Sequence, residues 1–221
     1  MNKMLILVAA LVLAAPRSAD ADSIVTKRPV GGDSVYWSQL GASLTPIPTP
    51  FSFTTTDGVT GTGSYAGGGD GLVCVQSVSC TGNFSPGDYM NWTILPNKGP
   101  GQGPMTLEFS QGFSQIGAQI QADYYGNFTA QICDNSNGQC FTEAGVSNGN
   151  SDGSAIYLGI AGTNITSVTY SLLRCYYDCN DFAINQMTLS QPTVPEPSSM
   201  LLMGGGLLGL AGVVRRRFLK L

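Results

Sequence analysis

The sequence predicts an all-β protein, an antiparallel β-sandwich of about ten strands in a jelly-roll-like arrangement. Between residues 22 and 193, apolar and polar residues alternate with the period of two that gives a strand one apolar face. Glycine contributes 29 of the 221 residues, and serine, threonine and asparagine are also frequent, which favours many tight turns. Helical periodicity does not interrupt this pattern, so we expect one domain, with helices only in the targeting segments at the two ends.

Residues 1–21 are typical of a secretory signal peptide. A short start containing Lys3 precedes an apolar stretch at residues 5–15, which is shorter than the roughly 20 residues of a membrane-spanning helix. Ala19 and Ala21 form the small-x-small pattern that signal peptidase recognises. We therefore expect a signal helix that is removed by cleavage after Ala21, which leaves an exported domain at residues 22–193.

The predicted domain is acidic and contains no histidine. Between residues 22 and 195 the chain has four basic and twelve acidic side chains, a net charge of −8. Because phosphate binding needs clustered Lys and Arg, this charge argues against a nucleic-acid partner. The absence of histidine from the whole chain excludes Ser-His-Asp and Cys-His catalysis.

Strand patterns begin early in the domain. They fall at residues 35–40, 51–56, 72–76 and 89–95. Trp37 and Trp92 lie within these patterns, so we expect both side chains in the core. Residues 41–70 are rich in glycine, threonine, serine and proline, and this composition predicts long loops near the first strands.

The middle of the domain shows the clearest alternation. Residues 105–109 form one strand pattern, and residues 115–133 read as a β-hairpin whose turn lies at residues 124–127. Residues 133–140 form the next turn, in which Asn137-Gly138 favours the φ > 0 geometry of a hairpin.

Three further strand patterns follow, at residues 156–160, 168–172 and 182–189. In the last of them, Phe182 and Ile184 are out of phase with Met187 and Leu189. One extra residue would return the apolar side chains to a single face, so we predict a β-bulge near Asn185-Gln186.

Six cysteines in an exported chain predict disulfides. Their spacing favours three local pairs, which are Cys74 with Cys80, Cys133 with Cys140, and Cys175 with Cys179. A metal site is the competing interpretation, but the chain has neither a C-x-x-C pair nor a histidine to support it.

Residues 194–221 are typical of a sorting and anchoring signal. The segment opens with Val194, Pro195, Glu196 and Pro197, continues through the uncharged apolar residues 200–214, and closes with Arg215, Arg216 and Arg217. The prolines end the preceding strand, and the apolar residues would form a helix of about 22 Å. The arginines favour the cytoplasmic side of a membrane, so the domain before them would face outward.

This tail resembles the PEP-CTERM signal of exported bacterial proteins, in its motif, its glycine-rich apolar stretch and its arginine triplet. The segments at residues 117–123, 126–130 and 181–185 also look like segments of such proteins. The resemblance implies processing by exosortase near the motif and an association with exopolysaccharide or biofilm. It also implies a protein of the bacterial envelope, surface or matrix that is transiently anchored with its C-terminus in the cytoplasm. A sortase signal would need an LPxTG-like motif, and a GPI signal would not normally end in three arginines.

Two turns carry oxygen ligands that suit Ca²⁺, although no cofactor is required by the sequence. One is Asp134-Asn135-Ser136-Asn137-Gly138, and the other is Cys179-Asn180-Asp181 together with Asp178. Both also fit turns in which Asx side chains cap the backbone.

Carbohydrate binding is the functional hypothesis that the residues favour for the domain. Tyr124, Tyr125, Tyr176 and Tyr177 form two aromatic pairs beside predicted turns, where rings can stack on sugars. A structural or adhesive surface role without a small ligand remains an alternative. A glycoside hydrolase that uses paired carboxylates is a third hypothesis, but the sequence shows no such pair, so we expect no enzyme.

Overall fold

The computed structural model describes residues 22–29, 32–94, 99–192, 204 and 206. The chain divides into two compact units, Met1–Gln191 and Pro192–Leu221. The predicted signal helix and the predicted tail helix lie outside the described residues, apart from Gly204 and Gly206, which are helical. Among the described residues, no helix is long and apolar enough to cross a membrane.

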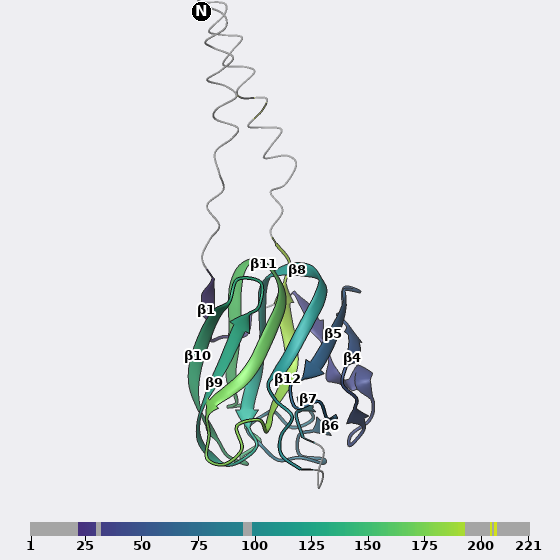
Figure 1. Ribbon diagram of the computed structural model, residues 1–221, viewed down its shortest axis with the longest axis vertical. Coiled ribbons are helices and arrows are strands. Elements are labelled where there is room, and N and C mark those ends of the chain that lie inside the picture. The colour runs from purple at the N-terminus through teal and green to yellow at the C-terminus, as the bar shows by residue number, and fades with distance from the viewer. Residues whose placement is uncertain (1–21, 30–31, 95–98, 193–203, 205, 207–221) are drawn as a thin grey trace, which may run out of the picture. The chain divides into compact units, whose positions relative to one another are not determined.

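The described part of the first unit is all-β, as predicted, and almost free of helix (Figure 1). Its helix is one 3-10 turn, η1 (Trp37–Leu40). Its strands are β1 (Ser23–Val25), β2 (Asp33–Val35), β3 (Pro46–Ile47), β4 (Phe51–Thr54), β5 (Thr60–Tyr65), β6 (Gly71–Val75), β7 (Tyr89–Trp92), β8 (Met105–Ala122), β9 (Gly126–Asp134), β10 (Gln139–Ser147), β11 (Ile156–Arg174) and β12 (Phe182–Ser190).

Two long strands, β8 and β11, fold the twelve-stranded sheet over on itself into a sandwich. They pair antiparallel with each other, and register shifts between Ala161 and Ser167 mark the bend in β11. On one side of the bend the order is β10-β9-β11-β8-β5-β4. On the other side β8 pairs with β12, and the order continues through β7 and β6 to β3, while β1 pairs with β11 and β2 with β12.

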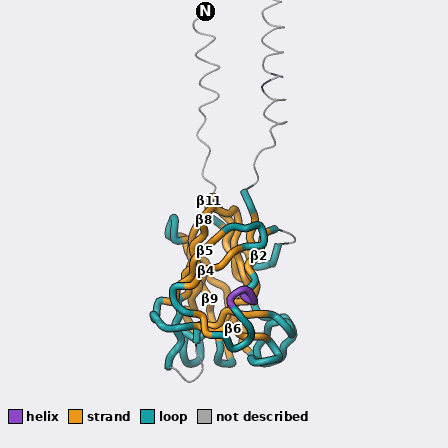
Figure 2. The backbone as a smooth tube through the Cα atoms, turned by 90° about the vertical axis from the view of Figure 1, so that its right-hand side faces the viewer, coloured by secondary structure: helices purple, strands orange, loops and turns teal. Residues whose placement is uncertain are grey.

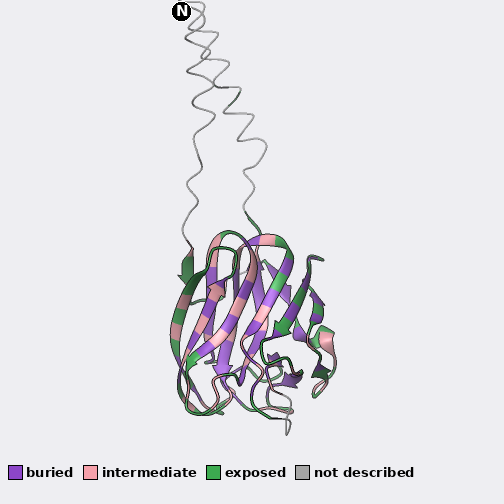
Figure 3. Cartoon of the chain, viewed as in Figure 1, coloured by how far each residue is buried: buried purple, intermediate pink, exposed green. Residues whose placement is uncertain are grey.

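The core lies between the two layers. Leu107 and Ile132 from one layer belong to the same buried cluster as Ile120 and Leu189 from the other. Burial alternates with a period of two along β4, β5 and the first residues of β8 (Figure 3). The alternation predicted for residues 105–109 is therefore confirmed, whereas near the end of β8 Gly117 and Gln121 are buried together with the apolar residues.

Several local predictions are confirmed. β9 and β10 form a hairpin in which Cys133 lies opposite Cys140, and Gly138 in its turn has a φ of 75°. All three local disulfides are formed. The pairing of β12 with β8 shifts register between Ile184 and Met187, which places the bulge where the apolar phase predicts it.

The predicted hairpin at residues 115–133 is wrong. β8 and β9 are consecutive, but β9 pairs with β10 and β11 and not with β8. Near its end, β8 already has β11 on one edge and β12 on the other. The chain therefore crosses to the opposite layer before β9 begins.

The strand predicted at residues 35–40 is also wrong, since β2 ends at Val35 and η1 follows. Trp37 is fully buried in η1, which confirms its predicted place in the core, and its indole N–H donates to the Asn185 carbonyl at 2.8 Å. This bond satisfies a carbonyl that the β12 bulge leaves outside the strand pairing.

The long loops predicted at residues 41–70 are replaced in part by strands. β5 lies there in spite of its glycines, because Gly61 and Gly63 pair opposite Phe53 and Phe51 of β4. A Cβ on either glycine would overlap the facing phenylalanine ring. The glycines therefore make room for the rings to lie across the strand.

Candidate functional site

The predicted tyrosines gather at one end of the domain. This is the end where β8 passes into β9 and where β11 passes into β12, so that Phe182 lies opposite Ala122 and Arg174 opposite Thr129. Seen from the side, loops dominate this end of the domain (Figure 2). Residues 123–125 and 175–181 therefore emerge as neighbouring loops although they are distant in the sequence.

Tyr124 and Tyr177, one from each loop, form the centre of the site. Their ring centroids are 4.9 Å apart, with an angle of 50° between the rings. Tyr124 is 39% exposed and Tyr177 is 76% exposed. A contacting pair of rings with faces open to solvent is a surface on which an apolar or sugar-like ring can stack.

The other two predicted tyrosines lie close by. The Tyr125 hydroxyl is 3.3 Å from the Thr81 hydroxyl, in a neighbouring loop, and Tyr125 is 54% exposed. Tyr176 is 81% exposed, and its Cβ lies beside the position that a Cβ on Gly126 would occupy. All four tyrosines thus belong to the loops of one end.

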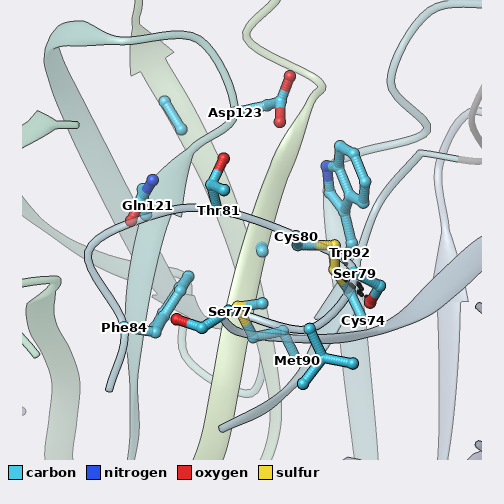
Figure 4. Close-up of a pocket in the computed structure, with 13 residues that line it drawn as sticks. Cys74, Ser77, Ser79, Cys80, Thr81, Phe84, Met90, Trp92, Gln121 and Asp123 are labelled. Carbon is cyan, nitrogen blue, oxygen red and sulfur yellow. Dashed lines mark hydrogen bonds between the residues drawn. A yellow bond between two sulfur atoms is a disulfide. The ribbon is translucent and has the colours of Figure 1, made fainter. Parts of the chain in front are cut away.

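A pocket of about 430 Å³ adjoins this end (Figure 4). Its lining includes the Cys74–Cys80 disulfide, Phe84, Trp92, Gln121 and Asp123. Trp92 packs against the small buried cluster that contains Phe84 and Met90, but it is partly exposed and lines the pocket, so its predicted place in the core is confirmed only in part. β7, which carries Trp92, lies beside β12 near the start of that strand, and this position brings the indole to the loop end.

Asp123 and Asp181 form a pair of carboxyl groups beside the pocket. The Trp92 indole N–H donates to Asp181 Oδ1 at 2.6 Å, and the two carboxyl groups are in hydrogen-bonding contact. Burial, followed by the charge of Asp123, raises the pKa of Asp181 to about 7, and burial raises the pKa of Asp123 as well. At neutral pH the pair therefore holds a proton for part of the time.

The sequence does not predict Asp123 as a site residue, and it predicts Asp181 only as a calcium ligand. Asp123 adjoins Tyr124 in the sequence, and Asp181 closes the loop that holds Tyr177. This position beside the predicted tyrosines is the sequence signal that could have marked both acids as site residues. Their contact depends on the pairing of β12 with β8.

Disulfides and capping bonds hold the loops of the site. Cys175–Cys179 closes the loop of Tyr176 and Tyr177, and Cys74–Cys80 closes a loop that lines the pocket. Asp178 accepts hydrogen bonds from the N–H groups of Gly101 at 2.7 Å and Asn180 at 2.9 Å. A surface whose loops are already ordered loses less entropy when it binds a partner.

Replacing both Cys175 and Cys179 by serine is expected to lower the free energy of unfolding by about 2 kcal/mol, since a short loop loses its cross-link in the unfolded state. The sequence separation of this pair is only 4, so the effect stays modest. Urea unfolding of the variant and the oxidised wild type measures it. An unchanged midpoint would contradict the expectation.

Two of the acids predicted as calcium ligands at this end are hydrogen-bonded within the protein. Asp178 and Asp181 both accept hydrogen bonds from protein N–H groups. In the part of the chain that the structure describes, no group of three or more His, Cys, Asp or Glu side chains is placed to hold a metal.

Comparison with known proteins identifies the tail of the chain. A family model of the PEP-CTERM protein-sorting motif matches residues 193–217, so the chain carries the sorting signal of an exported protein. No curated protein matches the chain. A solved structure, CsCBM6-3 from Clostridium stercorarium in complex with cellobiose, is similar at 10% identity, covering 72% of this chain and 93% of that chain with a TM-score of 0.25. A TM-score this low supports no argument about the ligand of the present chain.

Proposed function

We propose that this carrier of a PEP-CTERM sorting motif is a non-catalytic surface or matrix protein whose β-sandwich binds polysaccharide at its tyrosine end. The observation that carries the proposal is the contact between the exposed rings of Tyr124 and Tyr177 beside the pocket. Sugar rings present apolar C–H faces and a rim of hydroxyls, which match an aromatic surface with polar groups at its edge.

The polar groups at this edge are the carboxyl pair and an amide. Asp123 and Gln121 line the pocket together with Thr81. Sugar hydroxyls can donate to the Asp123 carboxylate and exchange hydrogen bonds with the Thr81 hydroxyl, so this lining suits hydroxyl-rich ligands, whereas the buried Gln121 amide is already bonded to Asn83 and Asn148. The charge of the domain, four basic against twelve acidic residues at 22–195, disfavours strongly anionic polymers.

We further propose how the chain is processed and where it is located. Signal peptidase removes residues 1–21, and exosortase acts near Val194-Pro195-Glu196-Pro197 after the tail has briefly anchored the chain in the membrane. The domain then belongs to the cell surface or the extracellular matrix, in contact with exopolysaccharide or biofilm.

The test is a titration of the oxidised domain, residues 22–192, with the exopolysaccharide of the producing strain. This range contains the whole described core. We expect saturable binding, and we expect Tyr124→Ala and Tyr177→Ala each to weaken it about tenfold or more, as central aromatic contacts do. Isothermal titration calorimetry gives both the affinity and the stoichiometry.

Tyr36→Ala is the matched control, because Tyr36 is 47% exposed but follows β2, which pairs with the other end of β12. This variant is expected to bind as the wild type does. Absence of saturable binding, or equal weakening by all three substitutions, would exclude the tyrosine end as a sugar site. The role would then be structural or adhesive, without a small ligand.

A further inference from the structure

A second pair of carboxylates lies at the opposite end of the domain, over the bend of β11. Asp22 precedes β1, which pairs with β11 at Ile160 and Ala161. Asp134 ends β9 and lies opposite Val168, on the other side of the bend. A Cβ on Gly162, within the bend, would overlap the Asp22 carboxylate, so the glycine leaves the space in which that group lies.

The hydrogen bonds of Asp134 are incomplete. Its Oδ1 accepts from the Ser136 N–H at 2.8 Å and also from the Ser136 hydroxyl. Its Oδ2 is buried without any hydrogen-bond partner, and the residue as a whole is 1% exposed. A buried carboxylate oxygen with no donor costs several kcal/mol unless something positive neutralises it.

Asp22 faces this unpaired group. The Asp22 carboxylate lies close to that of Asp134, and its Oδ2 accepts from the Asn137 amide at 2.7 Å.

We propose that Asp22 and Asp134 together bind one Ca²⁺ ion, which joins the start of the domain to the β9–β10 turn. The donors that the structure places here are oxygens, from two carboxylates and the Ser136 hydroxyl, and oxygen is the donor that a hard cation prefers. Zinc is a poor match, because the chain has no histidine and all six cysteines are in disulfides.

The protein would supply only some of the ligands of the Ca²⁺ ion. With two carboxylates and the nearby neutral oxygens, water must complete the six to eight ligands of Ca²⁺, so the affinity belongs to the range of about 10⁻⁴–10⁻³ M found in extracellular modules. The turn that supplies Asp134 is one of the two calcium candidates of the sequence, whereas Asp22 lies more than a hundred residues earlier.

The test uses the oxidised chain that begins at Asp22, so that its new terminal ammonium can compete for the carboxylates. In 10 mM CaCl₂, with ionic strength held constant, the melting temperature is expected to rise by about 3–6 °C. Calorimetric titration with CaCl₂ is expected to give one site per chain. No shift and no binding heat would mean that a proton or the ammonium neutralises the pair, and the proposal would be wrong.

Two variants and a control locate the ion. Asp134→Asn and Asp22→Asn are each expected to remove the calcium-dependent shift, and Asp22 is only partly buried, so its variant should fold. Asp70→Asn, at an exposed acid elsewhere, is expected to keep the shift. A shift that survives in both site variants, or that 10 mM MgCl₂ reproduces in full, would overturn the proposal.

Discussion

Replacing Asp181 by asparagine is expected to raise the free energy of unfolding at pH 8 by roughly 2–4 kcal/mol and to change it little at pH 4. The pKa of Asp181 is raised to about 7 in the folded domain, mainly by burial, from an ordinary value of 3.8. Between these two values the folded state holds a proton that the unfolded state has released. Stability therefore falls as the pH rises from about 4 to 7, and stays low above that range.

Asparagine at position 181 removes the pH-dependent loss of stability but keeps the contacts with Trp92 and Asp123. Its amide oxygen can accept from Trp92 Nε1 as Asp181 does now at 2.6 Å, and its NH₂ group can donate to Asp123. The variant thus imitates the protonated acid at every pH. Urea unfolding of wild type and variant from pH 4 to pH 9 measures the difference.

Asp70→Asn serves as the control, because this acid is exposed and far from the pair in sequence. Its pH profile is expected to follow that of the wild type. Parallel profiles for wild type and Asp181→Asn would show that the carboxyl pair ionises normally. In that case Asp123 and Asp181 would offer two charges to a ligand at neutral pH and not a shared proton.

The second large effect is expected at Trp37, where replacement by alanine should lower the free energy of unfolding by about 3–5 kcal/mol. The indole is fully buried and packs edge-on against Phe51 and Phe53, with centroid distances of 6.3 and 5.9 Å. Its removal leaves a cavity between η1 and β4. It also leaves the Asn185 carbonyl at the β12 bulge without its donor.

Trp37→Phe separates these two contributions, since it keeps much of the aromatic packing and loses the N–H. We expect it to cost less than the alanine variant, with about 1–3 kcal/mol from the unpaired carbonyl and the lost volume. Chemical unfolding of the three proteins is sufficient. A loss below 1 kcal/mol for Trp37→Ala would show that η1 does not contribute to the cooperative core.

Features encoded by neighbouring residues could be predicted from the sequence. The Asn137-Gly138 turn, the bulge after Ile184 and the three disulfides depend on phase or spacing within a few residues. The presence of most strands could also be predicted, because the alternation of apolar and polar residues is a local signal.

Features that depend on which strands meet could not be predicted. Local alternation marks residues 115–133 as two strands, but it cannot show that both edges of β8 are already occupied. β5 was missed because its glycines disfavour a strand, and only the rings of β4 explain them. The contact of Asp123 with Asp181, like that of Asp22 with Asp134, requires a register that spans the whole domain.

The direction of β12 determines how the domain would carry a mechanical load. Phe182 lies opposite Ala122 at the tyrosine end, and Ser190 lies opposite Gln115 at the far end, where the chain continues toward residue 192. A polymer that holds the tyrosine end against a tether at residue 192 would pull along the length of this strand. β12 has β8 on one edge and β2 and β7 on the other, so its hydrogen bonds would be loaded together in shear and not opened one by one. Under the proposed function, these hydrogen bonds would together resist tension along the domain.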